Sequence, residues 1–171
     1  MNDVLTLRAD CLNVLKWYVD ASFAVHPDFR SHTGGVLTMG KGAVQAVSSK
    51  QKLNTRSSCE SELVGCDDMA SKILWLKLFM EKQGYKIKKN LLYQDNQSTI
   101  RLLDNGRQSS SKQTRALNIR YFFLHDQKKK GNIDVEYCPS DKMWGDPMTK
   151  PLQGGHYKRM ADLLMGRSKQ D

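Results

Sequence analysis

The chain has 171 residues, of which 39% are hydrophobic and 26% charged, and these proportions exclude a disordered or fibrous protein. Subtracting 18 Asp and Glu from 27 Lys and Arg leaves a net charge of +9, which favours a polyanionic partner. The chain contains no stretch of eighteen apolar residues and no basic, apolar leader, so we expect a soluble intracellular protein without a membrane partner.

The first part of the chain predicts an antiparallel sheet. Residues 1–11 show no period and are expected to form a lead-in arm. From Leu12, the run LNVLKWYVDASFA is rich in β-forming residues and predicts a strand that ends near Asp20. The run GGVLTMGKGAVQAVSSK divides at the glycines of residues 40–42, which is typical of a hairpin. The first three strands should therefore form a meander.

A long amphipathic helix is predicted over residues 57–85. Ser57 and Glu60 have the spacing of a capping box, and Gly84 supplies a stop. At about 100° per residue, one apolar stripe is formed by Cys66, Met69, Ile73, Leu76 and Met80. Glu62 falls on this stripe, whereas Glu60 lies on the opposite face.

The position of Glu62 has two interpretations. A carboxylate on a packing face is costly to bury without a cation or hydrogen-bond donors, so it indicates a functional group. Alternatively, Glu62 lies at the rim of that face, in the first turn, where the helix dipole favours an acid. The choice depends on whether other acids reach the same place.

The next part of the chain predicts a strand followed by two helices. Residues 90–95, NLLYQD, form a short apolar run that ends in an acid, and a helix over residues 97–103 follows directly. Residues 106–115 form a polar, basic loop. A helix over residues 119–131 then carries lysines in its last turn, where the helix dipole favours cations.

The end of the chain predicts one more strand and two helices. Residues 132–137 alternate in polarity and predict a fifth strand. Asp146 is suited to cap a short helix that begins at Pro147, and residues 156–166 predict a last helix. Three antiparallel strands followed by helix-connected strands imply an α/β fold with a mixed sheet. We expect a single domain over residues 1–171, with a core at about 12–152.

Four acids share a similar setting in this arrangement. Asp20 ends the first strand, Asp95 ends the fourth, Glu62 lies on the inner helix face, and Asp146 starts a helix. If the first and fourth strands are neighbours and the long helix crosses them, the first three acids converge. Convergent carboxylates raise one another's pKa unless cations neutralise them. The cysteines and histidines are not spaced as ligands, and oxygen ligands alone favour Mg²⁺.

Such an acid cluster is typical of two-metal hydrolysis. It can hold two Mg²⁺ ions about 3.5–4 Å apart, one activating a water and one stabilising the leaving oxygen at phosphorus. This chemistry needs no histidine. Lys and Arg around an acidic centre can hold the phosphate backbone of a nucleic acid.

The same residues lie in a set of motifs with a family resemblance. The motifs are VDASFAVHPDFRSHTGG, KQKLNTRSSCESELVG, LYQDNQSTI, NIRYFF and VEYCPSDKMWGDPMTKPL. Over roughly residues 5–152, in one collinear order, they resemble the ribonuclease H domain of copia-type retrotransposon polyproteins. The resemblance implies a ribonuclease H-like fold, a five-stranded mixed sheet with helices on both faces. It also implies catalytic, metal-binding acids at Asp20, Glu62, Asp95 and Asp146.

The resemblance further implies an activity and partners. The activity is hydrolysis of the RNA strand of RNA–DNA hybrids with two Mg²⁺ ions, for which Mn²⁺ can substitute. A further partner is the reverse transcriptase portion of a parent polyprotein. Substrate contacts are expected at Ser22, Asn96, Gln97, Lys112, Arg115, Lys128 and Lys129. For the lysines of residues 128–130, a solvated helix end is the alternative interpretation, and the three tryptophans are expected in the core or at its rim.

The chain departs from the family at residues 114–122. The family usually reads TKHIDIRYH, whereas this chain reads TRALNIRYF, so that two histidines and one aspartate are missing. Because the metal chemistry does not require them, we expect the change to affect substrate handling. The alternative hypothesis is a decayed or domesticated module that binds nucleic acid or a protein partner without turnover.

Overall fold

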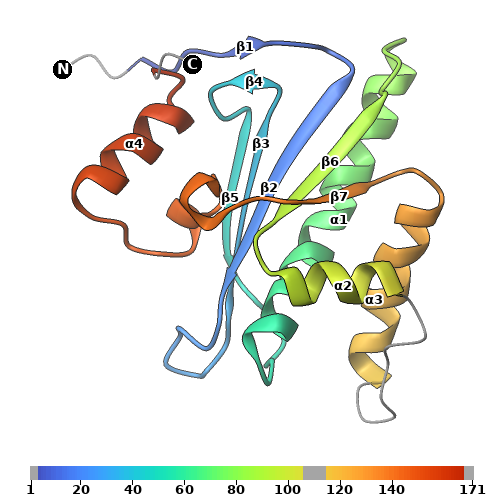
Figure 1. Cartoon of the computed structure of the whole chain (residues 1–171), viewed down its shortest axis with the longest axis vertical. Helices are drawn as coiled ribbons and strands as arrows, with labels where there is room; N and C mark the ends of the chain where they lie inside the picture. The colour runs from blue at the N-terminus through green and yellow to red at the C-terminus, as the bar shows by residue number, and fades with distance from the viewer. Residues whose placement is uncertain (1–3, 106–114, 168–171) are drawn as a thin grey trace.

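The computed structural model describes residues 4–105 and 115–167 (Figure 1). Its helices and strands, in chain order, are β1 (Arg8–Ala9), β2 (Val14–Ser22), β3 (His32–Thr38), β4 (Gly40–Lys41), β5 (Gln45–Lys50), α1 (Ser58–Lys82), β6 (Lys89–Gln94), α2 (Gln97–Asn105), α3 (Arg115–Lys129), β7 (Asp134–Tyr137), the 3-10 turns η2 (Ser140–Lys142) and η3 (Asp146–Met148), and α4 (Gly154–Leu164). Five strands form a sheet in the order β5-β3-β2-β6-β7. The predicted five-stranded mixed sheet is therefore confirmed.

The pairing of β2 decides where the sheet opens. On one side β2 is antiparallel to β3, which is antiparallel to β5, and this is the predicted meander. On the other side β2 is parallel to β6, but this pairing ends at Tyr18 and Tyr93, whereas β2 continues to Ser22. β6 instead stays paired with β7 as far as Gln94. The carboxyl ends of β2 and β6 thus diverge next to each other, at the sheet edge where open α/β folds bind ligands.

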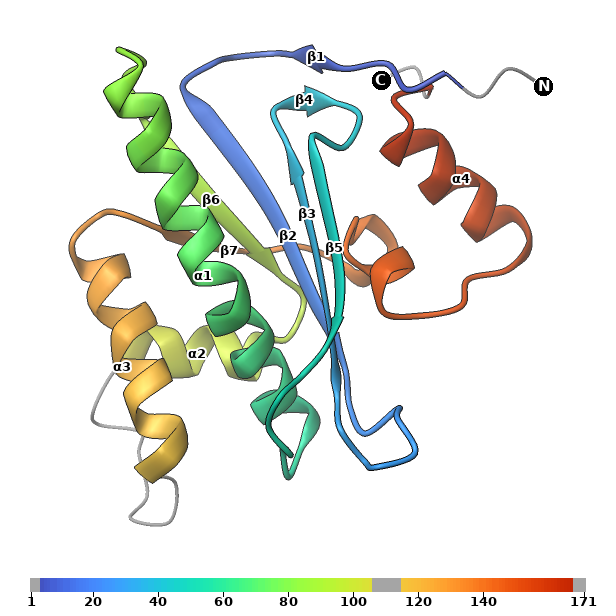
Figure 2. The same ribbon diagram turned by 180° about the vertical axis from the view of Figure 1, so that it is seen from behind.

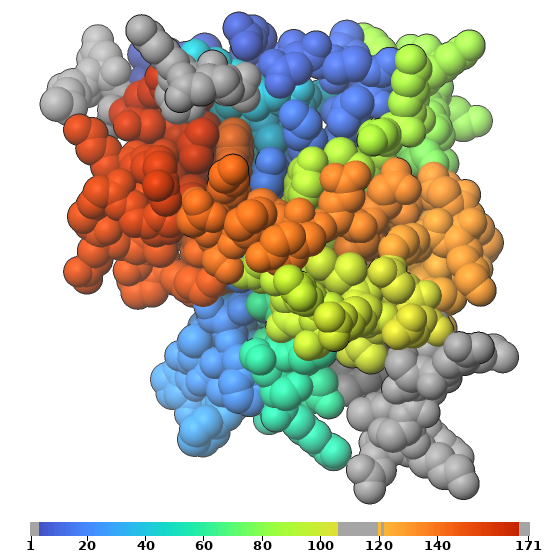
Figure 3. All heavy atoms as spheres, viewed as in Figure 1, coloured from blue at the N-terminus to red at the C-terminus, as the bar shows by residue number. Residues whose placement is uncertain are grey.

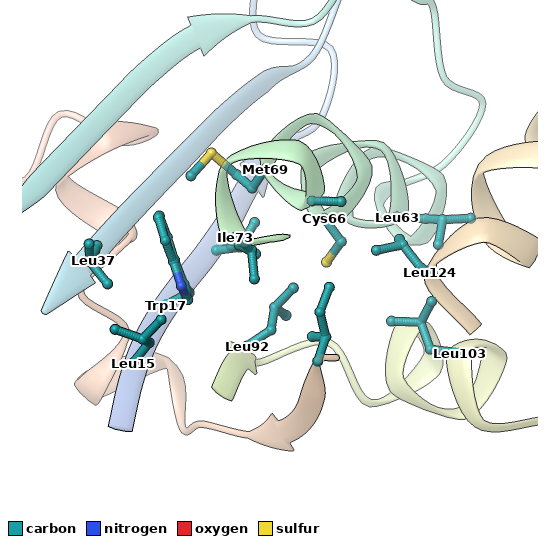
Figure 4. Packing of buried hydrophobic residues seen from close by; sticks show 13 residues of the cluster. Leu15, Trp17, Leu37, Leu63, Cys66, Met69, Ile73, Leu92, Leu103 and Leu124 are labelled. Atoms are coloured by element: carbon teal, nitrogen blue, oxygen red, sulfur yellow. The ribbon is translucent and has the colours of Figure 1, made fainter. Parts of the chain in front are cut away.

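One face of the sheet is covered by α1 and α3 (Figures 1 and 2). The start of α1 is fixed by the predicted cap, because the backbone N–H of Glu60 donates to Ser57 Oγ at 3.2 Å. The helix ends before Gly84, whose φ of 91° is one that glycine adopts without strain. The apolar stripe of α1 packs against β2, β3 and β6 in a core that contains Leu15, Trp17, Leu37, Cys66, Met69, Ile73 and Leu92 (Figure 4).

The opposite face of the sheet carries an aromatic stack. Tyr18 stacks on Tyr93 with ring centroids 4.8 Å apart and on Trp144 at 5.5 Å. Because Trp144 lies between η2 and η3, the stack holds this segment against the sheet. Gly34 allows the close approach, since a Cβ there would lie 2.6 Å from Thr149 Cγ2. Helical turns therefore lie on both faces of the sheet.

Three expectations from the sequence were wrong. The lead-in arm contains β1, which pairs with β4 in a separate two-stranded sheet, because its backbone meets the β3–β5 hairpin. Helix α3 begins at Arg115, inside the predicted loop. Trp75 is 63% exposed, since it lies off the packing stripe of α1. Among the described helices, none combines the length and the apolar character that crossing a membrane requires.

Candidate active site

Three of the predicted acids meet at the point where β2 and β6 diverge. Asp20 comes from β2, Glu62 from the first turns of α1, and Asp95 from the residue after β6; one carboxylate oxygen of each lies within 4.8 Å of the others. The parallel pairing brings the two strand ends to one edge, and the helical phase turns Glu62 toward them. Asp20 and Glu62 are almost completely buried, at 1% and 5% exposure.

Among the described residues, the hydrogen-bond donors of Glu62 are all neutral. Gln94 Nε2 donates to its carboxylate at 3.1 Å, and the backbone N–H of Ala21 also donates. Burial, followed by the negative charges of Asp20 and Asp95, raises the pKa of Glu62 to about 9. Three oxygen ligands with an excess of negative charge are the donor set that a hard divalent cation such as Mg²⁺ prefers, so these residues fit the predicted metal.

Gln94 is a site residue that the sequence analysis missed. Its side chain is fully buried; Nε2 contacts Glu62, and Oε1 accepts from the backbone N–H of Asp95 at 2.8 Å and of Asn96 at 3.0 Å. One amide therefore fixes both a carboxylate of α1 and the turn that presents Asp95. A signal was present in NLLYQD, because Gln94 shares the strand face of the buried Leu92.

Asp146 reaches the cluster through a lysine. Lys150 Nζ lies 2.9 Å from Asp146 Oδ1 and 3.4 Å from Asp20, and the Thr149 hydroxyl donates to Asp20 as well. Burial raises the pKa of Asp20; Thr149 and Lys150 oppose this, whereas the charges of Asp146 and Asp95 add to it. Figure 3 shows the segment from β7 to Lys150 crossing the face of the molecule above α2.

The predicted capping role of Asp146 was wrong. Gly145 is the capping residue of η3, and Asp146 is its first residue, with a buried side chain. Its position depends on Gly145, where a Cβ would lie 3.1 Å from the Cβ of Asp20. Thr149 and Lys150 also contact the acids but were not predicted as site residues, although both lie in the motif DPMTKPL. No local period relates these two residues to the distant Asp20.

Three of the expected substrate-binding residues lie beside the acids. The Ser22 hydroxyl donates to the Thr149 carbonyl at 3.1 Å and so ties β2 to the segment after η3. Asn96 Oδ1 accepts from the backbone N–H of Thr99 at 3.1 Å, which caps α2. Gln97 is exposed on the first turn of α2. Of the three, Gln97 has its side chain open to a ligand.

The other four expected contacts lie on basic segments. Lys112 falls outside the described residues, and Arg115 is the first residue of α3. Lys128 forms an ion pair with Asp104 at the end of α2, so this lysine has a partner within the protein and is not simply a solvated helix end. Lys129 is exposed beside it.

The fold is that of known ribonucleases H. An RNase H1 isolated from compost aligns with a TM-score of 0.56 and 16% identity, covering 80% of this chain and 92% of that one. The N-terminal RNase H domain of a Mycobacterium tuberculosis protein aligns with a TM-score of 0.55 and 11% identity, covering 79% and 89%. A prototype foamy virus protease–reverse transcriptase aligns at 0.51 and 11% identity, covering 98% of this chain and 23% of that one. The strand order and these matches define a ribonuclease H-like fold.

Two Pol polyproteins of plant transposons are similar to this chain in sequence. The Pol polyprotein of transposon TNT 1-94 from Nicotiana tabacum is 27% identical over 152 residues, 88% of this chain and 11% of the polyprotein. That of transposon RE1 from Arabidopsis thaliana is 26% identical over 149 residues, 86% of this chain and 10% of the polyprotein. No family model matches the chain. The resemblance to the ribonuclease H domain of retrotransposon Pol polyproteins is thus confirmed, and the chain spans about a tenth of the length of these relatives.

Proposed function

We propose that the protein is a metal-dependent endoribonuclease that cuts the RNA strand of RNA–DNA hybrids. The observation that carries the proposal is the meeting of Asp20, Glu62 and Asp95 at the carboxyl ends of β2 and β6, within a ribonuclease H-like fold. Each acid comes from a different element, so the cluster exists only in the folded chain. Asp20 and Glu62 are almost completely buried, and burying a carboxylate such as Glu62 among neutral donors is costly, so a binding site is the simplest reason to keep the three acids together.

In this proposal some residues would bind the metal ions and others would position them. Asp20, Glu62 and Asp95 would hold one divalent ion, and Asp20 and Asp146 a second. Mg²⁺ at these positions would supply an activated water and stabilise the leaving oxygen, and Mn²⁺ could take its place. Gln94 keeps the Glu62 carboxylate and the Asp95 backbone in position before any ion arrives. Thr149 and Ser22 fix the segment that carries Asp146 against β2.

The net charge of +9 supports a nucleic-acid partner. In this proposal Gln97 and Asn96, at the start of α2, lie next to the cleaved strand, and Lys112, Arg115 and Lys129 contact phosphates more distantly. Because the relatives are Pol polyproteins and one structural neighbour is a protease–reverse transcriptase, the reverse transcriptase part of a longer chain is the proposed protein partner. An intracellular location belongs to the same proposal.

The alternative is a module that binds without turnover. The observation that favours it is the departure from the family pattern at residues 114–122. Under this alternative the protein would bind a nucleic acid or a protein partner and would not cleave the RNA.

A cleavage assay on an end-labelled RNA–DNA hybrid separates the two. We expect cleavage of the RNA strand with Mg²⁺ or Mn²⁺, none in EDTA, and none of duplex DNA. The matched control is Asp95→Asn, which keeps the side chain's size and removes its charge. Hybrid binding without metal-dependent cleavage would support the binding module instead, and equal cleavage by Asp95→Asn would show that the acid cluster does not carry the activity.

A further inference from the structure

Lys150 holds an unusual position among the cations of the described residues. Its Nζ lies between two buried carboxylates, 2.9 Å from Asp146 and 3.4 Å from Asp20. The Asp146 side chain is 9% exposed and that of Asp20 is 1% exposed, whereas the Lys150 side chain is 41% exposed. A positive charge is thus inserted from the solvent side into the gap between two acids.

Asp20 belongs to two groups of acids at once. In the first group Asp20 lies beside Glu62 and Asp95, and Glu62 accepts from a neutral donor. In the second group Asp20 and Asp146 both contact Lys150. The two groups match the two ion positions of the proposed function. Lys150 occupies the second position, where an ammonium group can satisfy two carboxylates through its three N–H donors.

We infer that Lys150 is a tethered counter-cation that holds the Asp20–Asp146 pair together in the metal-free protein and competes with a divalent ion for these two carboxylates. Leaving two acids buried side by side without a cation is strongly unfavourable, so the ammonium stabilises the metal-free fold. Its flexible four-carbon stem and its exposure allow it to swing into solvent when an ion arrives. The ion must first break this pairing, so its apparent affinity is lower than the acids alone would give.

This inference rests on the proposed function, because it needs Asp20 and Asp146 to bind a metal. The chain offers a matched control in Lys50, whose side chain is also 41% exposed and whose Nζ lies 2.7 Å from Asp28. Lys50 is the last residue of β5, and its aspartate partner is 45% exposed, so its loss removes a surface ion pair without touching the acid cluster.

The test measures the melting temperature of the full chain, first in EDTA and then with increasing MgCl₂, while KCl is adjusted to keep the ionic strength constant. Metal binding is measured separately by calorimetry. In EDTA, Lys150→Met should melt at a lower temperature than the wild type. With Mg²⁺ it should recover, because an ion that binds the folded state raises stability. Its Mg²⁺ midpoint should be lower by about tenfold, the usual range for coupling between two binding events. Lys50→Met should leave the midpoint unchanged.

Two outcomes overturn the inference in distinguishable ways. If the wild type responds to Mg²⁺ and Lys150→Met has the same midpoint, Lys150 is only a structural ion pair and the proposed function stands. If the wild type shows no response to Mg²⁺ or Mn²⁺, the proposed metal site fails and the inference fails with it. If Lys150→Met does not fold in EDTA, Lys150→Arg is the deciding variant. The forked guanidinium group of arginine binds carboxylates more tightly than an ammonium group, so the Mg²⁺ midpoint must rise. An unchanged or lower Mg²⁺ midpoint contradicts the inference.

Discussion

The two sides of the acid site are built in different ways. Asp20, Glu62 and Asp95 come from a central strand, a long helix and a strand end, and the partners of Glu62 carry no charge. Asp146 comes from a 3-10 turn and is held by Lys150. The difference shows that a long regular element can hold a carboxylate with uncharged hydrogen-bond donors, as the Gln94 amide holds Glu62 on α1. The short turn η3 needs an ion pair and an aromatic stack to fix the position of its carboxylate equally well.

Removing acids one at a time should give the largest effects and should separate the two sides. Asp20→Asn affects both ion positions and should abolish measurable cleavage, without rescue by Mn²⁺. Asp146→Asn affects only the side held by Lys150, so residual cleavage should remain, and Mn²⁺ should rescue it because it binds such sites more tightly than Mg²⁺. The measurement is the Mn²⁺-to-Mg²⁺ rate ratio of the two mutants. The comparison fails if Asp146→Asn is as inactive and as little rescued as Asp20→Asn.

Glu62→Gln tests the helical side by itself. Removing a carboxylate that preorganises charge should lower the cleavage rate by about a hundredfold or more. Glu60→Gln is the matched control, because Glu60 lies on the same helix and its carboxylate accepts the Arg56 N–H at 2.7 Å. The control should keep its activity and lose at most about 1 kcal/mol of stability, the size of a capping contact. Similar rate losses in both mutants would contradict the face assignment.

The pH dependence of stability tests the uncompensated charge on this side. Because the pKa of Glu62 is raised from 4.5 to about 9 in the folded state, the folded form binds a proton that the unfolded form releases. In EDTA the contribution of Glu62 to the free energy of unfolding should therefore be fully present below pH 4.5 and be lost as the pH rises toward 9, by at most about 1.4 kcal/mol per pH unit.

Glu62→Gln should flatten this dependence, and its gain in stability over the wild type should grow with pH up to about pH 9. Part of the slope should remain, since the pKa of Asp20 is raised as well. Denaturant unfolding at several pH values measures both effects. An identical pH profile for the mutant and the wild type would show that Glu62 is ionised in the metal-free fold.

The smallest effect is expected on the side of the 3-10 turn. A Cβ at Gly34 would lie 2.8 Å from the Gly145 carbonyl oxygen and from Met148 Cβ, so Gly34→Ala should push the segment away from β3. Overpacking of this kind costs about 1–3 kcal/mol. Gly155→Ala is the control, because a Cβ there meets no atom of residues 4–105 and 115–167 within 4 Å and should change stability by less than about 0.5 kcal/mol. Equal unfolding free energies for the two variants would mean that the segment around η3 moves away from β3 without loss of stability.

The sequence by itself determined the regular parts of this protein. The 3.6-residue period of α1 placed Glu62 on the stripe of Cys66 and Ile73 and away from Glu60. The ends of two apolar runs placed Asp20 and Asp95 at strand ends, and Ser57 marked the start of the helix. These features are local, since each depends on which face or end of one element a residue occupies.

Only the tertiary structure decided what each of these faces meets. The pairing of β2 with β6 as far as Tyr18, and no farther, brought Asp20 next to Asp95. The aromatic stack and the absence of a side chain at Gly34 brought Lys150 to Asp20, 130 residues earlier in the chain. No local period shows either event, because a period reveals the face that a residue is on, whereas its partner is chosen by the packing of elements far apart in the chain.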